Sequence, residues 1–307
     1  MVAYILAGRC SRAERRGKRK AISLDDAALS EKTQKRYYAA LKKLLPAVEA
    51  SHTESDLDGC VSRWVRKMWA QGEPMLTVGD GLSALHFFQP WTKKRIPQAW
   101  KLFAIWKRIE IPSRAPPLTR PLVQSMAAYE IDHCNLEMAA LLLLSFHCLL
   151  RTGEALTLTP NDLILGTDSG ICSLKGTKSG KRNSANEAIS ITDPAVLDTV
   201  TVVCSLKRQA NLEMAPIWSS SPSAFRVRFK KLCGIFGLQT HCFRPYSLRR
   251  GGATFFFQTH KSMEEALIRG RWESSRVARV YIMDALSYLP SIRCNSVTMD
   301  MLQKYHL

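Results

Sequence analysis

The chain has 307 residues, which is enough for two domains that each bury a hydrophobic core. Hydrophobic residues make up 46% of it, and no apolar run approaches the roughly 20 residues of a transmembrane helix, so we expect no membrane partner. The charge balance is unusual, because 44 Lys and Arg residues stand against 26 Asp and Glu residues, for a net charge of +18. A surface this basic attracts polyanions, and the charge therefore favours a nucleic acid as the partner.

The nine cysteines predict free thiols and no metal site. No two of them form a CxxC pair, and the three that directly follow a histidine lack the spacing of zinc ligands. Near the N-terminus a short apolar stretch precedes the basic residues, which is the wrong order for a secretory signal. We therefore expect an intracellular, reducing location, either the nucleus or a bacterial cytoplasm.

Two features of composition predict the domain plan. Seven basic residues against one acid between Arg9 and Lys20 indicate a disordered basic arm over 1–25. Three prolines within 111–118 exclude helix and central strand there and predict a stiff interdomain linker. The expected domains are then a helical one over 26–110, with basic faces suited to a duplex backbone, and a second one over 119–307.

Apolar residues at helical spacing predict the elements before the linker. Tryptophans recur in these segments and are expected to pack in the core rather than to stack on bases. The expected helices are 31–45, 57–70, 79–88 and 96–109, and the tryptophans are Trp64, Trp69, Trp91, Trp100 and Trp106.

After the linker the pattern alternates between helices and a short β-prone region. The helix over 135–150 is apolar nearly all round, so we expect it to be buried. A Gly- and Lys-rich loop between the last two strands predicts a hairpin. The expected helices are 118–128, 135–150, 195–206, 224–236, 247–258, 263–270 and 275–286, and the strands are 162–165, 171–174 and 188–191. The predicted fold class is mainly α with one small β-sheet, in two domains.

Three segments of the second half carry candidate chemistry. They are Leu149-Leu150-Arg151-Thr152-Gly153-Glu154, Tyr246-Ser247-Leu248-Arg249-Arg250-Gly251-Gly252, and Gly270-Arg271-Trp272 followed by Arg279-Val280-Tyr281. An Arg followed three residues later by an acid, a second Arg box, and a Tyr nine residues after a Trp are each weak signals, but their order and separations agree. On these residues the chain resembles the tyrosine recombinase (phage integrase) family, over roughly 118–286, and Lys178-Ser179-Gly180 resembles the lysine-bearing hairpin of that family.

The resemblance implies a role for each matched residue. Arg151 and Arg249 would bind a scissile phosphate, and Glu154 would orient Arg151. Lys178 would be the general acid for the leaving 5′ oxygen, with Lys175 and Lys181 as rivals in the same loop. Trp272 would donate its indole N–H to the phosphate or pack against the site. Tyr281 would be the nucleophile and form a 3′-phosphotyrosine, without cofactor or metal.

Tyr246 departs from the family pattern, which most often has His there. A phenol is a poor general base at neutral pH, although it can still donate a hydrogen bond to phosphate. Two readings stay open: an active enzyme with altered proton transfer, or a weakened site. Because both arginines, the loop lysine and Tyr281 are present, we favour the active enzyme.

The resemblance implies double-stranded DNA as the partner, site-specific recombination or integration by a mobile element as the function, and a homotetramer on two sites. The alternatives are a catalytically weakened DNA-binding relic, strand relaxation like that of a type IB topoisomerase, and RNA binding, for which no RNA-binding motif is present. The C-terminal segment 297–307 either docks on a neighbouring protomer or packs on its own chain. Further candidates for DNA contact are Lys32, Lys35, Arg36, Lys93, Lys94, Arg95, Lys181 and Arg250.

Overall fold

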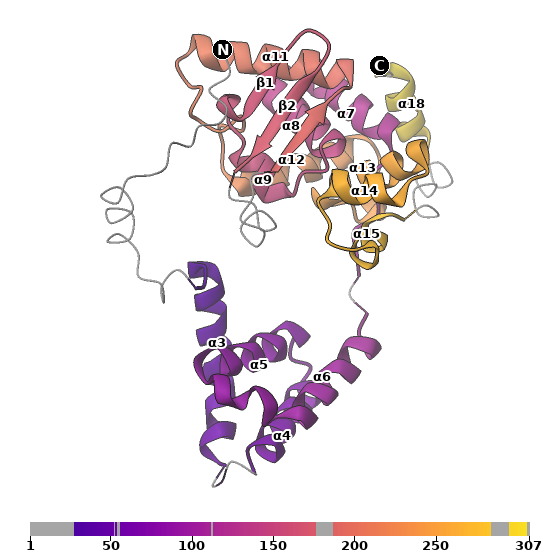
Figure 1. Ribbon diagram of the computed structural model, residues 1–307. Coiled ribbons are helices and arrows are strands. Elements are labelled where there is room, and N and C mark those ends of the chain that lie inside the picture. The colour runs from indigo at the N-terminus through magenta and orange to yellow at the C-terminus, as the bar shows by residue number, and fades with distance from the viewer. Residues whose placement is uncertain are drawn as a thin grey trace, which may run out of the picture. The chain divides into compact units, whose positions relative to one another are not determined.

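The computed structural model describes residues 28–51, 53, 56–111, 113–175, 187–283 and 295–305, and the basic arm expected over 1–25 lies outside them. Contacts divide the chain into two compact units, Met1–Ser113 and Arg114–Leu307 (Figure 1). The division falls within 111–118, the segment expected to be a linker, and the role of each unit as a separate domain stays a prediction. No described helix has the length and apolar character to cross a membrane.

Unit 1 is a small helical bundle. Ser30 begins its first helix by accepting a hydrogen bond from the backbone N–H of Thr33, at 3.3 Å, which satisfies a donor that the helix leaves open. Pro97 stands in the first turn of the last helix, where a missing N–H is harmless. The helices are α3 (Glu31–Glu49), α4 (Leu57–Ala70), α5 (Met75–Phe88) and α6 (Pro97–Ile109), with a 3-10 turn at Pro90–Lys94.

The tryptophans of unit 1 divide between core and surface. Trp64 and Trp106 are buried, and Trp100 packs partly buried against the same core, as predicted. The prediction was wrong for Trp69 and Trp91, which are 42% and 50% exposed. Trp69 lies at the rim of the bundle, edge-on to Trp106, and Trp91 stands in the 3-10 turn, where its indole bonds Gln89. Helical spacing alone did not distinguish these rim positions from the interior.

Helix α8 (Leu136–His147) is the centre of unit 2. Every residue from Met138 to Phe146 is buried, as its apolar character on all faces predicted. Its most extensive contacts are with α7 (Arg120–Asp132), α11 (Pro194–Gln209) and α13 (Tyr246–His260). The remaining helices are α9 (Thr152–Thr157), α12 (Pro222–Ile235), α14 (Met263–Gly270), α15 (Ser275–Tyr281) and α18 (Ser296–Lys304).

A three-stranded antiparallel sheet completes unit 2 (Figure 1). Its strands are β1 (Leu163–Leu165), β2 (Gly170–Leu174) and β3 (Glu187–Ile191), in the order β1-β2-β3. The predicted hairpin is confirmed, since β2 and β3 pair antiparallel with Leu174 opposite Glu187. Alternate side chains point into the core, as period 2 requires. Unit 2 therefore has the predicted fold class, mainly α with one small sheet.

Helix α18 packs on its own chain. The hydroxyl of Thr298 donates to the carbonyl of Phe236 at 2.6 Å, and the hydroxyl of Tyr305 donates to Asp132 at 3.1 Å. Met301 and Leu302 pack against the main core of unit 2. Of the two expectations for this segment, the structure has the packing in cis.

Candidate active site

Tyr281 lies at the end of α15, among residues from the other two segments. Its ring centroid lies 4.7 Å from that of Trp272 and 5.7 Å from that of Tyr246. The guanidinium carbon of Arg249 lies 5.2 Å from the Tyr281 ring. Residues far apart in the sequence thus lie together within unit 2. Tyr281 lies beside the other site residues of the same chain.

Arg249 is fully buried in α13. Its guanidinium donates to the carbonyl of Leu149 and, at 2.7 Å, to the carbonyl of Gly270, while its Nε has no partner among the described residues. Burial, and then repulsion from Arg271 and Arg151, lowers the pKa of Arg249 to about 10. The group stays charged at neutral pH, and a buried, uncompensated cation is a strong site for an anion.

Arg151 begins α9, which sequence periodicity did not predict. Glu154 closes the turn: its carboxylate accepts from the backbone N–H of Arg151 at 2.8 Å and from the guanidinium of Arg151 at 2.5 Å. Burial alone would lower the pKa of Arg151, but the hydrogen bond and the charge of Glu154 outweigh it, so the pKa is raised. Glu154 therefore orients Arg151 in the manner expected, and the Arg151 side chain stays 28% exposed.

Trp272 is 8% exposed and packs against both Arg249 and Tyr281. Its indole N–H is buried and has no hydrogen-bond partner among the described residues. The buried indoles of Trp64 and Trp106 in unit 1 are unpaired as well, so the unpaired donor alone does not mark a site. An oxyanion bound by Arg249 would supply the missing acceptor.

Tyr246 begins α13 and is 37% exposed. Partial burial and then a hydrogen bond with the Tyr281 hydroxyl raise the pKa of Tyr246 well above its usual value. The Tyr246 phenol is consequently neutral at physiological pH. It can form a hydrogen bond with the Tyr281 hydroxyl, but it is not deprotonated at neutral pH and so cannot act as the general base.

The predicted general acid, Lys178, and its rival Lys181 lie outside the described residues. The other rival, Lys175, directly follows β2 and pairs with Asp162 at 2.7 Å. A lysine held by a carboxylate is a less available proton donor, and the structure does not distinguish Lys178 from Lys181. The assignment stays a prediction.

Arg250 lies beside Arg249 but faces another way. It is 2% exposed, and its guanidinium donates to the carbonyl of Val280 at 2.8 Å and to the sulfur of Met283. As placed here, Arg250 holds the backbone around Tyr281. Its predicted contact with DNA stays a prediction.

The basic residues predicted on unit 1 differ in their surroundings. Arg36 forms a bidentate ion pair with Asp80, with one contact of 2.9 Å, and Lys35 pairs with Glu31 at 2.6 Å. The other candidates for DNA contact on this unit are Lys32, Lys93, Lys94 and Arg95, all exposed. Charge on the sequence did not predict the ion pair of Arg36, because its partner Asp80 lies 44 positions away.

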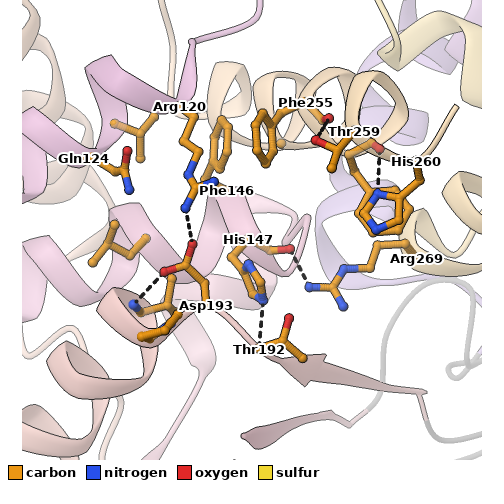
Figure 2. Close-up of a pocket in the computed structure, with 16 residues that line it drawn as sticks. Arg120, Gln124, Phe146, His147, Thr192, Asp193, Phe255, Thr259, His260 and Arg269 are labelled. Carbon is orange, nitrogen blue, oxygen red and sulfur yellow. Dashed lines mark hydrogen bonds and ion pairs between the residues drawn. The ribbon is translucent and has the colours of Figure 1, made fainter. Parts of the chain in front are cut away.

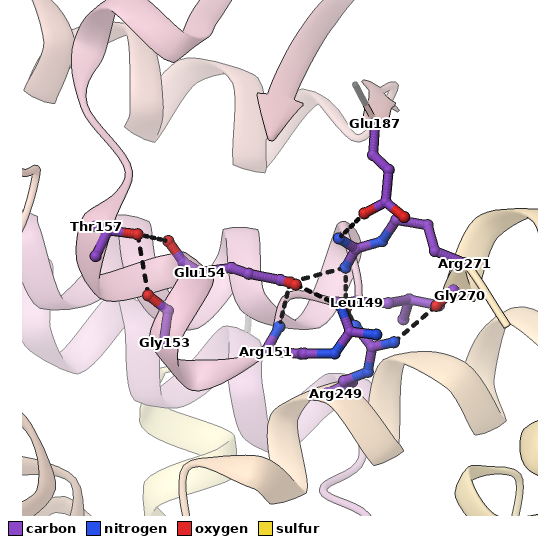
Figure 3. Close-up of polar contacts among 9 residues, drawn as sticks. All are labelled: Leu149, Arg151, Gly153, Glu154, Thr157, Glu187, Arg249, Gly270 and Arg271. Atoms are coloured by element: carbon purple, nitrogen blue, oxygen red, sulfur yellow. Dashed lines mark hydrogen bonds and ion pairs between the residues drawn. The ribbon is translucent and has the colours of Figure 1, made fainter. Parts of the chain in front are cut away.

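Sequence reasoning missed Arg271, which binds Glu154 and the carbonyl of Leu149 (Figure 3). It also missed a basic hollow of about 580 Å³ between α12 and the start of α13, with Thr152 and Tyr246 in its lining. The cations that line it are Arg226, Lys230 and Arg244. The first two are four residues apart on α12, a spacing that puts them on one helix face and could have been noticed.

A separate cavity of about 330 Å³ lies where α7, α8 and α13 meet the β3–α11 turn (Figure 2). None of the predicted catalytic residues lines it. Burial, and then the charge of Arg269, lowers the pKa of His147 in this cavity to about 4. Nowhere in the described residues do three His, Cys, Asp or Glu side chains gather as a metal site would require.

No protein-family model matches the sequence, and no curated protein matches it either. Solved structures do match in fold. The integrase of the Tn1549 transposon, in complex with transposon right end DNA, matches with a TM-score of 0.61 and 12% identity, over 90% of this chain and 97% of that one. A lambda integrase dimer bound to a COC′ core site has a TM-score of 0.56 and 16% identity, over 89% and 94%.

A third structure, XerH site-specific recombinase bound to palindromic difH substrate, has a TM-score of 0.54 and 12% identity, over 84% of this chain and 76% of that one. At such low identities the likeness shows the fold alone. This chain has the fold of the tyrosine recombinases and integrases, the family that its motifs resemble.

Proposed function

We propose that this chain cuts and rejoins DNA in site-specific recombination or integration, with Tyr281 as the nucleophile. The observation that carries the proposal is the meeting of Tyr281 with the buried Arg249 and with Trp272. Their chemistry is that of phosphoryl transfer, because a phenol stands ready to attack beside a cation and a free N–H donor. The shared fold supports this function but does not by itself establish it.

The scissile phosphate would lie against Arg249 and Arg151. Guanidinium groups suit its non-bridging oxygens, because they donate in a planar fork and stay charged. The unpaired indole N–H of Trp272 would donate to one of these oxygens. These donors would stabilise the charge that builds on the phosphorane as it forms.

In the cleavage step the Tyr281 oxygen attacks phosphorus and forms a 3′-phosphotyrosine. The phenol proton of Tyr281 passes to solvent water, because the neutral Tyr246 cannot accept it. The bond from phosphorus to the 5′ oxygen breaks, its electron pair stays on that oxygen, and Lys178 supplies the proton. The phosphodiester energy is kept in the tyrosyl ester, so a 5′ hydroxyl can reverse the step on another strand. The proposal assigns no step to a metal or a nucleotide cofactor.

DNA would be held by basic residues outside the reacting centre. The hollow with Arg226, Lys230 and Arg244 adjoins Tyr246, so it suits a phosphate backbone leading to the site. The exposed lysines of unit 1 would add phosphate contacts of their own. A lambda integrase tetramer has been solved on a Holliday junction, and we propose a tetramer for this chain by analogy.

A second candidate is a DNA-binding relic that no longer cuts. Tyr246 is the observation in its favour, because a neutral phenol replaces a base at this position. Strand relaxation of the type IB kind would use the same chemistry with the original strand as acceptor. The trapping experiment below separates the relic from the two active alternatives, and strand transfer to a second duplex separates those two.

The test is to trap the covalent intermediate. The full chain is incubated with supercoiled plasmid and with nicked duplexes spanning its own genetic flanks, then quenched with SDS. We expect DNA joined to protein through its 3′ end, lost in Tyr281→Phe and kept in Tyr305→Phe, which removes a phenol hydroxyl that binds Asp132 instead of the site residues. Salt-sensitive DNA binding with no adduct on any substrate would favour the relic instead.

A further inference from the structure

Arg271 joins parts of unit 2 that are distant in sequence. Its side chain is 6% exposed, and its guanidinium reaches Glu154 at 2.9 Å, Glu187 at 3.2 Å and the carbonyl of Leu149 at 3.0 Å. These partners come from α9, from the start of β3 and from the turn after α8. Figure 3 shows the group at the centre of this network.

Gly270 and Arg271, at the end of α14, have backbones that are constrained in different ways. Arg271 ends α14 in the left-handed region, with φ of 56°, a conformation that glycine adopts far more easily. Gly270 precedes it, and a Cβ there would lie 2.2 Å from the Trp272 ring. The close approach explains the glycine. Lys261 ends α13 with the same left-handed backbone, so the importance of Arg271 lies in the contacts of its guanidinium and not in its backbone.

Two of the groups that Arg271 binds, a carbonyl and a carboxylate, are shared with the proposed phosphate-binding arginines. The Leu149 carbonyl also accepts from Arg249, and the Glu154 carboxylate also accepts from Arg151. Moving Arg271 would therefore disturb the anchors of both other guanidinium groups at once. Glu187 adds a link to the hairpin, because it is the first residue of β3 after the loop.

We propose that Arg271 is a positioning residue, which holds Glu154 and the Leu149 carbonyl so that Arg151 and Arg249 face one phosphate. The inference deepens the proposed function and rests on it. Arg271 contacts no reacting atom in this scheme. It acts through the two anchors that it shares with the arginines.

Charge gives Arg271 a second effect on the same site. The cluster contains three guanidinium groups and two carboxylates, so Glu154 divides its charge between Arg151 and Arg271. Without Arg271, Glu154 would neutralise Arg151 more completely. Arg151 would then attract a phosphate less strongly, because less of its charge would remain uncompensated.

The test compares Arg271→Lys with Arg269→Lys in the full chain. Lysine keeps the charge but has no planar fork, so it cannot bridge Glu154, Glu187 and Leu149 together. Arg269 is the matched control, because it is also partly buried but donates to the carbonyl of His147 (Figure 2). It donates as well to the hydroxyl of Ser190. DNA affinity, melting temperature and the rate of Tyr281 adduct formation at saturating DNA are measured for each.

We expect Arg271→Lys to slow adduct formation by about 100-fold, the effect of a misplaced reacting group, with DNA affinity within about threefold of the unaltered chain. Arg269→Lys should stay near the unaltered rate. In a Glu154→Gln background the loss from Arg271→Lys should shrink, because the shared anchor is already altered. An unchanged rate in Arg271→Lys, an undiminished loss in the Glu154→Gln background, or equal losses of rate and melting temperature in both lysine variants would overturn the proposal.

Inorganic phosphate separates this inference from the proposed function. If the unaltered chain forms no adduct on any DNA, the proposed function fails. Calorimetric titration still measures the affinity for phosphate of the site formed by Arg151 and Arg249. Arg271→Lys should then bind phosphate about tenfold more weakly than Arg269→Lys, since tenfold corresponds to a modest loss of charge-assisted bonds. Equal phosphate affinities for the two variants would overturn the positioning role.

Discussion

Tyr246 is the residue that should set the pH dependence of the proposed reaction. Its pKa is raised by burial and by the Tyr281 hydroxyl, so its neutral form persists from acid to mildly basic pH. A neutral phenol gives no base to accept the Tyr281 proton near pH 7. We therefore expect the rate of adduct formation in the unaltered chain to keep rising between about pH 7 and pH 9.

Tyr246→His should shift this profile toward lower pH. Imidazole has a pKa near 6.5, so its neutral form can accept the proton already at about pH 7, and a general base commonly adds at least 100-fold. We expect a gain of about tenfold or more at pH 7, with a plateau above the histidine pKa. Rates of adduct formation from pH 5.5 to 9 measure it, with Tyr246→Phe as the control. A histidine variant with the profile of the unaltered chain would exclude proton transfer at this position.

Among the elements, α13 holds the segment that follows Tyr281. The Thr254 hydroxyl donates to the carbonyl of Arg250 at 2.9 Å and accepts from the backbone N–H of Met283 at 3.0 Å. Arg250, one turn earlier, donates to the carbonyl of Val280. One helix face thus carries two polar side chains that fix the backbone on both sides of the nucleophile.

Thr254→Val should loosen this attachment. The substitution keeps the shape but removes the acceptor for the partly buried N–H of Met283. We therefore expect a loss of about 1 kcal/mol in unfolding free energy and slower adduct formation. Thr259→Val is the control, because its hydroxyl makes the same bond to the carbonyl four residues back and is exposed. Denaturant unfolding and single-turnover trapping measure the two effects. Equal behaviour of the two valine variants would show that the bond to Met283 contributes nothing.

Local patterns predicted most helices and all three strands, because each depends on residues close in sequence. The ranges of α4 and α14 agree with the predicted ones at both ends. Helix α9 was missed, since its six residues are too few for a periodic signal. The contact of the Glu154 carboxylate with the backbone N–H of Arg151 forms its first turn instead. The three boxes were identified by spacing, and the structure brings their described residues together.

The supporting contacts could not be predicted, because they join distant positions. Arg271 reaches Glu154 across 117 positions, and nothing in a GRW sequence indicates a carboxylate partner. The pair Gly251-Gly252 is explained only by packing: a Cβ on either would lie 1.9 Å from a backbone carbonyl oxygen, of Leu118 or of Phe146. Glycine is normally unfavourable within a helix, so close approach of the backbones decides these two positions.

Over the whole molecule, the net charge of +18 implies DNA binding that weakens steeply with salt. Each phosphate that a cation neutralises releases counterions and adds about 0.9 to the slope of log affinity against log salt. Cations already paired with carboxylates should contribute less than solvated ones. Substituting an exposed lysine of unit 1 should therefore change the slope more than substituting a basic residue that is paired with a carboxylate.

The double variant Lys93→Ala/Lys94→Ala should lower this slope by about 1.8, because both side chains are exposed at the end of the 3-10 turn. Arg36→Gln should change it by much less, because Asp80 already holds that guanidinium. Fluorescence anisotropy with a labelled duplex, from about 50 to 300 mM KCl, gives the slope for each full-length variant, and circular dichroism checks their folding. The affinity of the lysine variant should fall similarly for unrelated duplexes, since phosphate contacts carry no sequence information. If only the Arg36 variant lowered the slope, the DNA surface of unit 1 would lie on α3 instead.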